Sequence, residues 1–276
     1  MTSLQTGELQ FAARSRRAQN LSPAQPFARE FLDFYRDVAG FQRNLYAQLR
    51  KDEPRDATSN LGIDLRSALD LTVVLPHFRG FLSFVQEKGP APLAGAARQI
   101  WELSTDSWIE SLQAYWEHAG RYDQQIGPFA QFFPRAFLQP YAELLAARVV
   151  LPPQVVTTSV CPLCAARPLL GVLRLEGDGG KRLLLCSFCS AEWEFRRILC
   201  PTCGEETEGK LPVYVAEQMP HVRVEACETC KFYLRTVDLT KDGNAVPLVD
   251  DIAALPLSFW ADEHGYSRLQ PNLLGT

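Results

Sequence analysis

Four Cys-x-x-Cys pairs define the middle of this chain, and they read Cys161-Pro-Leu-Cys164, Cys186-Ser-Phe-Cys189, Cys200-Pro-Thr-Cys203 and Cys227-Glu-Thr-Cys230. Together they contain all eight cysteines, so none is left over. Two intervening residues let both sulfurs of a tight turn face one ion, and each pair therefore supplies two ligands. Because a tetrahedral metal site needs four, the pairs have to combine.

The intervals between the pairs indicate how they combine. Between Cys164 and Cys186 lie 21 residues, between Cys203 and Cys227 lie 23, and between Cys189 and Cys200 lie only 10. A hairpin in each long interval would bring its two ends together, whereas the short interval suits a single connecting strand. We therefore predict one site from the first two pairs (Cys161, Cys164, Cys186 and Cys189) and another from the last two (Cys200, Cys203, Cys227 and Cys230). An interleaved pairing remains the alternative.

The residues around the cysteines follow a strand pattern with turn residues between the strands. Leu169–Leu175 and Arg182–Cys186 flank the sequence Glu-Gly-Asp-Gly-Gly, which predicts a hairpin. Val213–Ala216 and Val222–Ala226 flank a second turn. Glu192–Leu199 and Phe232–Val237 are further predicted strands.

Four thiolates make a soft, closed coordination shell, which suits zinc or iron. Such a shell leaves no position for a reactive water, so it argues against hydrolytic catalysis and favours a structural role. Two other readings remain: cysteines without metal, and a thiol–disulfide oxidoreductase. The latter needs an exposed pair of low pKa beside a helix N-terminus, whereas these pairs lie between predicted strands.

The first 160 residues lack cysteine and carry helical periodicity. From Phe27 to Leu49, apolar residues recur in steps of three and four, which predicts an amphipathic helix that ends before Pro54. The other predicted helices span Asp64–Leu75, His77–Lys88, Pro92–Leu103, Asp106–His118 and Pro134–Val149, the last bent or restarted at Pro140. We expect an all-α bundle of six or seven helices before a linker at Pro152-Pro153. One more helix is predicted at Val249–His264, ending at Gly265.

Composition narrows the range of functions. Residues 157–235 carry 10 basic and 10 acidic side chains, so the cysteine region lacks the basic excess with which zinc modules bind nucleic acid. No run of about 20 apolar residues predicts a membrane span, and Arg14-Ser15-Arg16-Arg17 is not followed by the apolar core of a secretion signal. We therefore expect a cytoplasmic protein, in which reduced cysteines bind metal.

Other polar residues are interpreted more simply. The four histidines, His77, His118, His221 and His264, are scattered and are expected to be surface or packing residues. Asp250-Asp251 begins the C-terminal helix, where acidic residues are favoured by the helix dipole. We find no phosphate-binding loop and no nucleophile motif, so no catalytic residue is predicted and the protein is expected not to be an enzyme.

The order of these segments along the chain and their amino-acid sequences resemble those of the bacterial formate dehydrogenase accessory proteins of the FdhE family. Besides the four cysteine pairs, the resemblance rests on Glu192-Trp193, Arg197-Ile-Leu-Cys200, Cys230-Lys-Phe-Tyr233-Leu, Phe133-Pro-Arg-Ala-Phe-Leu138-Gln139-Pro140-Tyr141-Ala-Glu143, Val249-Asp250-Asp251-Ile-Ala-Ala-Leu255 and Gly265-Tyr266-Ser-Arg268-Leu-Gln-Pro-Asn272. It covers most of the chain and is weakest before about residue 60. In rubredoxin-like turns the residue after the second cysteine is often glycine, because it adopts positive φ. Here only Gly204 fits; Ala165, Ser190 and Lys231 depart, which bears on turn geometry and metal preference.

The resemblance implies rubredoxin-like modules, iron as the bound metal and a cytoplasmic role in making active respiratory formate dehydrogenase through contact with its catalytic subunit. It also implies that the eight cysteines are the metal ligands. The predicted fold is a multidomain α+β protein: a helical bundle (1–153), two tandem rubredoxin-like or zinc-ribbon modules (154–195 and 196–240) and a C-terminal helix with its tail (241–276). The competing hypotheses are a zinc-ribbon module that binds protein or nucleic acid through purely structural zinc, and a redox enzyme that uses iron–thiolate electron transfer.

Overall fold

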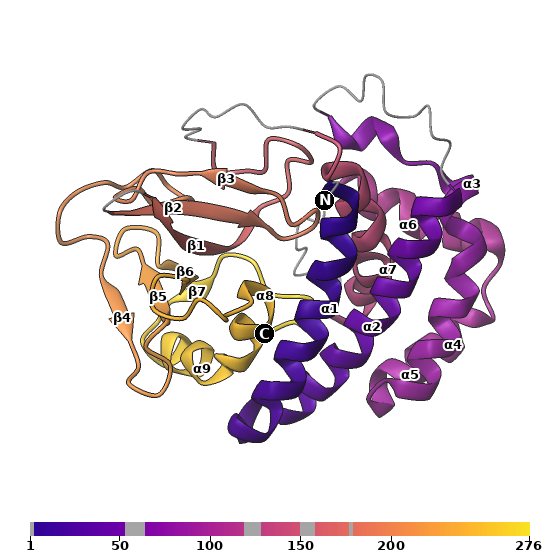
Figure 1. Cartoon of the computed structure of the whole chain (residues 1–276), viewed down its shortest axis with the longest axis horizontal. Helices are drawn as coiled ribbons and strands as arrows, with labels where there is room; N and C mark the ends of the chain where they lie inside the picture. Colours follow the sequence, from indigo (N-terminus) through magenta and orange to yellow (C-terminus); the bar gives the residue numbers. More distant parts are fainter. Residues whose placement is uncertain (1–2, 53–63, 119–127, 150–157, 177–178) are drawn as a thin grey trace.

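The computed structural model describes residues 3–52, 64–118, 128–149, 158–176 and 179–276. Helices fill one side of the molecule, and a sheet with two further helices fills the other (Figure 1). The helical half contains α1 Ser3–Leu21, α2 Arg29–Asp52, α3 Leu71–Val74, α4 Phe78–Lys88, α5 Ala91–Trp101, α6 Thr105–Glu117 and α7 Pro128–Ala146, with short 3-10 turns η1 Ser22–Ala24, η2 Pro26–Ala28, η4 Leu65–Ala68 and η5 Leu75–His77. Across the described ranges, no helix combines the length and the apolar character that a bilayer crossing requires.

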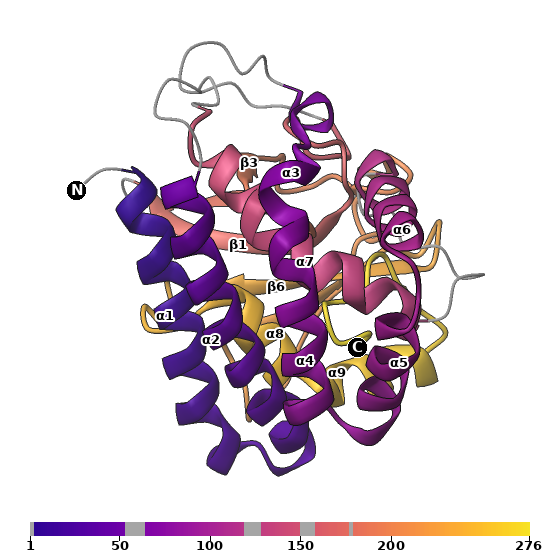
Figure 2. The same ribbon diagram turned by 90° about the vertical axis from the view of Figure 1, so that its right-hand side faces the viewer.

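The first helix, α1, was not predicted from the sequence. It lies alongside α2 in both views (Figure 1, Figure 2) and buries Gly7, Phe11, Arg14 and Ala18, which are spaced four, three and four residues apart. Only one of these four is a large apolar residue, so the hydrophobic periodicity is weak. At Gly7 a Cβ would overlap the ring of Tyr46, so glycine is what allows α1 to approach α2 here.

Helix α7 starts earlier than predicted and continues through both Pro134 and Pro140. A proline within a helix leaves the carbonyl four residues earlier without its usual donor, which for Pro140 is the carbonyl of Ala136. The buried Gln42 of α2 replaces that donor: its Nε2 lies 2.8 Å from the Ala136 oxygen. The predicted restart at Pro140 is therefore wrong: α7 continues as one helix, and a side chain from a neighbouring helix satisfies the freed carbonyl.

Gln42→Leu is expected to lower the free energy of unfolding by about 1–3 kcal/mol, because it leaves the buried Ala136 carbonyl without a donor. Urea unfolding followed by circular dichroism measures the change. The matched control is the double variant Gln42→Leu with Pro140→Ala, which restores a backbone N–H to the carbonyl and should recover part of the loss. Equal destabilisation in the single and the double variant would contradict this account.

The segment predicted as one helix from Asp64 to Leu75 forms η4, α3 and η5 instead. Asp64 acts as an N-cap, with its carboxylate accepting from Arg66 N at 3.0 Å. A second aspartate, Asp70, does the same for Thr72 N at 2.9 Å. The extended backbone at Leu69 and Asp70 ends one short helix and starts the next.

A seven-stranded sheet joins both cysteine modules. Its strands are β1 Pro168–Glu176, β2 Gly179–Cys186, β3 Glu192–Glu194, β4 Val213–Val215, β5 Val222–Ala226, β6 Phe232–Asp238 and β7 Ser267–Arg268. The order is β3-β2-β1-β6-β5-β4, with β7 beside β6. The two modules meet where β1 and β6 run parallel, and there Gly171 lies opposite Thr236. A Cβ at Gly171 would overlap the Thr236 side chain, so this glycine permits the close approach of the two modules.

The C-terminal segment forms two helices, α8 Pro247–Ala253 and α9 Leu255–Glu263, instead of the single predicted one. Pro256 lies in the first turn of α9, where its missing N–H is tolerated. At the junction of the two helices, Arg235 of β6 donates to the carbonyl of Ala254 at 2.9 Å. The strand predicted at Glu192–Leu199 is also shorter, since only Glu192–Glu194 pairs with β2.

Candidate metal centres

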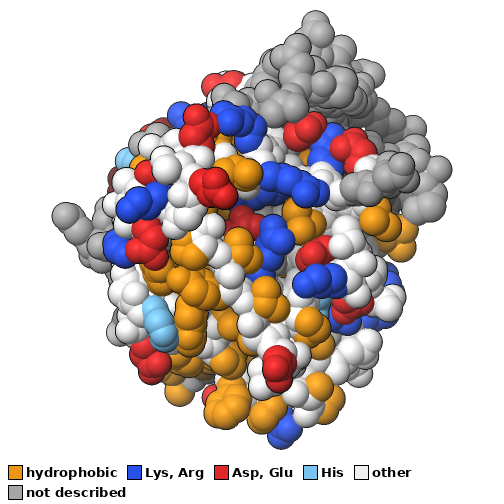
Figure 3. All heavy atoms as spheres, turned by 90° about the vertical axis from the view of Figure 1, so that its left-hand side faces the viewer, with side chains coloured by type: hydrophobic (Ala, Val, Ile, Leu, Met, Phe, Trp, Pro, Cys, Tyr) orange, Lys and Arg blue, Asp and Glu red, His pale blue; other side chains and the backbone are white. Residues whose placement is uncertain are grey.

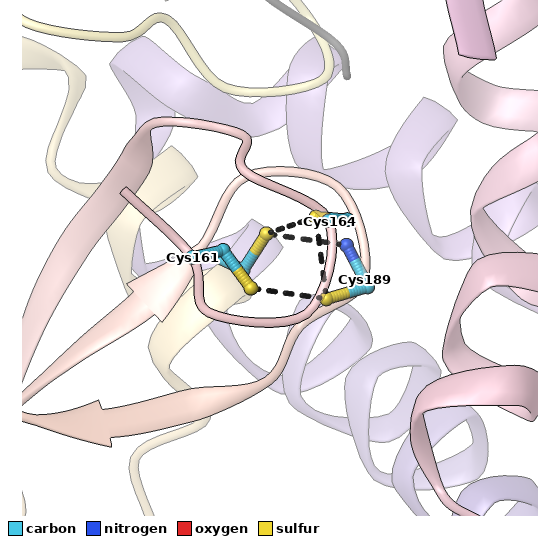
Figure 4. Close-up of side chains that lie close together, drawn as sticks. Cys161, Cys164 and Cys189 are labelled. Atoms are coloured by element: carbon cyan, nitrogen blue, oxygen red, sulfur yellow. Dashed lines mark hydrogen bonds between the residues drawn. The ribbon is translucent and has the colours of Figure 1, made fainter. Parts of the chain in front are cut away.

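The eight cysteine sulfurs gather into two groups of four, in the grouping that the sequence intervals predict. The first group, called site 1, contains Cys161, Cys164, Cys186 and Cys189, and the second, called site 2, contains Cys200, Cys203, Cys227 and Cys230. Each group joins the two ends of one hairpin-containing interval. In Figure 4 the sulfurs of the labelled cysteines of site 1 turn towards one another from two facing turns.

The distances between sulfurs fit a four-coordinate metal ion. In site 1 the Cys161–Cys189, Cys164–Cys186 and Cys164–Cys189 sulfurs are 3.6, 3.4 and 3.6 Å apart. In site 2 the Cys200–Cys230 and Cys203–Cys227 sulfurs are each 3.7 Å apart. A metal held at about 2.3 Å from four sulfurs in a tetrahedron separates them by roughly 3.8 Å, whereas a disulfide would require about 2.05 Å. Both groups therefore have the donor set and the spacing of a metal-binding site.

All four Cys-x-x-Cys turns share one backbone conformation. In each, the N–H of the first cysteine donates to the carbonyl five residues later, at 2.8–3.0 Å. The residue after the second cysteine has positive φ in every turn: 53° at Ala165, 55° at Ser190, 75° at Gly204 and 59° at Lys231. The three departures from glycine thus leave the turn geometry unchanged, although each non-glycine residue holds a left-handed conformation that costs roughly 1–2 kcal/mol.

Gly204→Ala is expected to lower stability by about 1 kcal/mol through backbone strain alone, because no atom of the described residues lies within 4 Å of the added Cβ. The matched variant is Ala165→Gly, which removes the same strain from an equivalent turn and should raise or preserve stability. Thermal unfolding of the metal-loaded proteins compares the two. An unchanged Gly204→Ala protein would show that the turn tolerates any residue.

The sulfurs of site 1 influence one another's ionisation. Burial raises the pKa of the Cys186 thiol, and hydrogen bonds with the neighbouring thiols raise the pKa of Cys189. Hydrogen bonds from Cys164 and the other two thiols lower the pKa of Cys161. Four closely spaced thiols therefore do not all ionise by themselves, whereas a bound cation deprotonates its sulfur ligands.

Site 1 is packed against the helical half of the molecule. Phe188, between Cys186 and Cys189, contacts the rings of Tyr115 and Trp116 of α6, with ring centroids 5.4 and 5.3 Å apart. Arg135 of α7 donates to the carbonyl of Ser187 at 3.1 Å. The same guanidinium donates to the carbonyls of Pro271 and Asn272, each at 2.9 Å. One buried arginine thus connects site 1, α7 and the C-terminal tail.

Glu143, two helical turns after Arg135, makes a second connection. Its Oε1 accepts from Ser190 Oγ at 2.7 Å, from Gln139 Nε2 at 3.0 Å and from Arg14 Nη1 of α1 at 3.0 Å. The Arg14 and Glu143 side chains are each only 5% exposed. Residues 135, 139 and 143 lie on one face of α7, so a polar stripe inside the protein fixes site 1 to two helices.

Site 2 is much more open than site 1. All four cysteines of site 1 are buried, whereas in site 2 Cys203 is exposed and Cys230 is partly exposed. Glu205 links the two turns of site 2 by accepting from Thr207 N at 2.9 Å and from Thr229 Oγ1 at 2.6 Å. These hydrogen bonds lower the pKa of Glu205 to about 2, so the carboxylate stays ionised at neutral pH. Site 2 is therefore held together at the surface by polar contacts.

We expect site 2 to release its metal first when a thiol reagent attacks the folded protein, by about tenfold in rate, because reactivity follows access to the sulfur. Metal release is followed with a chromogenic chelator, and the modified cysteines are located by mass spectrometry. Cys203 should be labelled before any cysteine of site 1. Simultaneous loss of both ions would show that exposure does not decide the order.

The sequence did not reveal a buried charged cluster near the sheet. Asp250 accepts from Arg17 Nε at 3.0 Å and lies 2.8 Å from His221 Nε2, and its side chain is fully buried. His221, Asp242 and Asp250 lie close enough to suggest a third metal site. The guanidinium of Arg17 already occupies that cluster, 2.8 Å from Asp242 and 2.6 Å from Asp250. We interpret it as a network of ion pairs, which a single-sequence reading of Asp250 as a helix-start residue could not show.

Comparisons with known proteins agree with this architecture. Residues 160–197 match the family model for the FdhE central domain, and residues 198–274 match that for the FdhE C-terminal domain. A protein FdhE homolog of Aquifex aeolicus is 27% identical over 210 residues, covering 76% of this chain and 72% of the relative. One of Pseudomonas putida is 31% identical over 219 residues, covering 74% of this chain but 63% of the relative. The crystal structure of the FdhE protein from Pseudomonas aeruginosa matches with a TM-score of 0.65 and 26% identity, over 96% of this chain and 94% of that chain.

Proposed function

Because the chain belongs to the FdhE family, we propose that it is an accessory protein needed to make active formate dehydrogenase. In this role it contacts the catalytic subunit of the enzyme in the cytoplasm and takes no part in formate oxidation itself. The observation that carries the proposal is the architecture: two four-sulfur centres lie in modules that share one sheet, and that sheet packs against a helical half. The FdhE crystal structure matches this arrangement over 96% of the chain.

A non-catalytic role is supported by the chemistry of both sites. Four sulfur ligands complete a tetrahedral shell and leave no open position for a substrate or a reactive water. The buried polar groups described above, such as Arg135 and Glu143, are committed to contacts between elements. The protein therefore acts through its surface, with metal centres that hold that surface in shape.

We propose iron as the metal in both centres and zinc as the alternative. The donor set accepts either ion, because both bind four thiolates in a tetrahedron. Metal analysis and a visible spectrum of protein purified without air distinguish them: oxidised iron–thiolate centres absorb visible light and zinc centres do not. A colourless protein with two zinc ions would leave the accessory role intact but refute iron.

Deleting the gene is expected to abolish formate dehydrogenase activity while the catalytic subunit is still synthesised. The measurement is enzyme activity together with immunodetection of that subunit, and the control is complementation with the intact gene. Normal activity in the deletion strain would refute the accessory role. In that case, salt-dependent binding of the purified protein to DNA or RNA would favour the nucleic-acid-binding alternative.

A further inference from the structure

The two edges of the sheet differ in chemistry. At one edge, β3 reads Glu-Trp-Glu, and its carboxylates pair with Arg174 at 2.7 Å and with Lys181 at 2.8 Å. At the other edge, β4 reads Val-Tyr-Val and carries no charge. Charged residues protect an edge strand from pairing with other chains, so β3 is protected in this way and β4 is not.

The backbone of β4 offers hydrogen-bonding groups to a further strand. Val213 pairs with Glu225 and Val215 with Arg223, while Ala226 N donates to Pro212 O at 3.0 Å. In an antiparallel pair the hydrogen-bonded positions alternate, so Pro212 and Tyr214 direct their groups to β5. Val213 and Val215 therefore direct their N–H and C=O groups outward. Within the described part of the chain, no hydrogen bond from outside the sheet reaches these groups.

The two faces of β4 differ: one carries exposed apolar side chains, and the other packs against the protein. Val213 and Val215 are 51% and 50% exposed and lie on the same face of the strand. On the opposite face Tyr214 packs against Trp260 of α9, with ring centroids 4.5 Å apart, and its hydroxyl lies 3.2 Å from that of Tyr266. Figure 3 looks onto the side of the molecule that carries β4, and hydrophobic side chains gather there. An added strand would find a preformed surface.

The chain on both sides of β4 is acidic. From residue 205 to residue 217 there are four glutamates and one lysine, and Glu208 and Glu217 are exposed. The neighbouring cation Arg223 is already bound to Glu225 through two hydrogen bonds, of 2.9 and 2.6 Å. The exposed Glu208 and Glu217 therefore add negative charge near the two ends of β4, which favours positive charge at the ends of a segment that pairs with it.

We propose that β4 is a docking site for an extended, basic segment of another protein, which binds as an additional strand. Backbone hydrogen bonds to Val213 and Val215 supply the affinity, apolar side chains of the segment cover the two valines, and basic residues near its ends meet the glutamates. Site 2 holds the edge in place, because Glu228, beside Cys227, donates from its N–H to the carbonyl of Lys210 at 2.9 Å. Docking therefore depends on metal at site 2. This docking site goes beyond the accessory role, since it specifies the chemistry of the bound segment and not which protein the segment belongs to.

Binding of a defined peptide tests the proposal. The probe is a fluorescent seven-residue peptide with capped ends and the sequence Lys-Val-Thr-Val-Thr-Val-Lys, measured by fluorescence anisotropy on the metal-loaded full chain. Replacing both lysines with glutamate should weaken binding several-fold, and N-methylation of alternate peptide nitrogens should abolish it. The variant Glu208→Gln with Glu217→Gln should weaken binding about threefold and flatten its dependence on salt.

Two substitutions in β4 separate backbone pairing from folding. Val215→Pro removes an outward N–H, which an edge strand tolerates, and should weaken binding at least about tenfold while two metal ions and the circular dichroism spectrum are retained. The matched control Val215→Thr keeps the backbone and should bind within about twofold of the wild type. Unchanged binding by Val215→Pro, or equal binding of the N-methylated peptide, would overturn the proposal. So would a dimer in sedimentation that Val215→Pro abolishes, because a second copy would then occupy the edge.

Discussion

Cys186→Ser is expected to hold one metal ion per chain instead of two and to unfold at a much lower temperature than the wild type. Cys186 is fully buried, and its sulfur accepts from Phe188 N at 3.3 Å and from Cys189 N at 3.4 Å. A four-sulfur site contributes its binding free energy to folding, which for structural zinc in small peptides is about 10–16 kcal/mol. Because site 1 lies against α6 and α7, its loss should also loosen the helical half. Metal analysis and thermal unfolding by circular dichroism measure both effects.

Cys203→Ser provides the matched control for that experiment. It also removes one sulfur from a four-sulfur site and should also leave one ion per chain. Cys203 is exposed, however, and site 2 lies at the end of the sheet that carries β4. The helical transition should therefore stay near that of the wild type. If both variants lose helix at the same temperature, or if Cys186→Ser keeps two ions, the prediction that the buried site 1 stabilises the helical half more than the exposed site 2 is wrong.

Asp251→Asn is expected to lower the free energy of unfolding by about 3–5 kcal/mol, since it leaves buried arginines without their counter-ion. The Asp251 carboxylate lies 2.8 Å from Arg235 Nε and 2.7 Å from Arg268 Nη2. Arg235 and Asp251 are both 0% exposed. Asn272 Nδ2 also donates to this carboxylate, at 3.0 Å. Urea unfolding measures the loss.

The control for Asp251 is an exposed pair of the same chemistry. Arg36 and Asp37 lie 3.0 Å apart with side chains 37% and 32% exposed, so Asp37→Asn should change stability by less than about 0.5 kcal/mol. A second control replaces both buried partners, as Asp251→Leu with Arg235→Met. Removing both charges should recover part of the loss, because the fully buried Arg235 is no longer left without a counter-ion, whereas Arg268 still is. Equal effects of Asp251→Asn and Asp37→Asn would contradict the importance of burial.

Local sequence patterns predicted several helices closely and others poorly, for identifiable reasons. The strong periodicity from Phe27 to Leu49 predicted α2, which spans Arg29–Asp52. Helix α1 escaped notice because its buried face contains Gly7 and Arg14, whose fit depends on Tyr46 and Glu143 elsewhere in the chain. Such residues carry no apolar periodicity, so only the neighbouring helices reveal why they are buried.

The prolines also show that local sequence does not decide where a helix ends. Pro256 separates α8 from α9, although the local sequence had suggested one helix. Pro140 does not interrupt α7, because Gln42 supplies the missing donor from another helix. A proline removes a backbone N–H in both places, but the local sequence does not show whether a residue from another helix replaces that donor, as Gln42 does at Pro140.

The sequence by itself determined that the eight cysteines form four pairs, and the lengths between the pairs favoured the two four-cysteine groups; the structure excluded the interleaved pairing. It also determined the division into a helical half and a β half, because hydrophobic periodicity is a local property. Only the tertiary structure decided that both modules share one sheet through β1 and β6, that site 1 is buried against α7 while site 2 is open, and that β4 forms an edge of the described sheet. These features depend on contacts between residues far apart in the chain, such as Arg135 with Asn272 and Gly171 with Thr236, and no local pattern encodes such pairs.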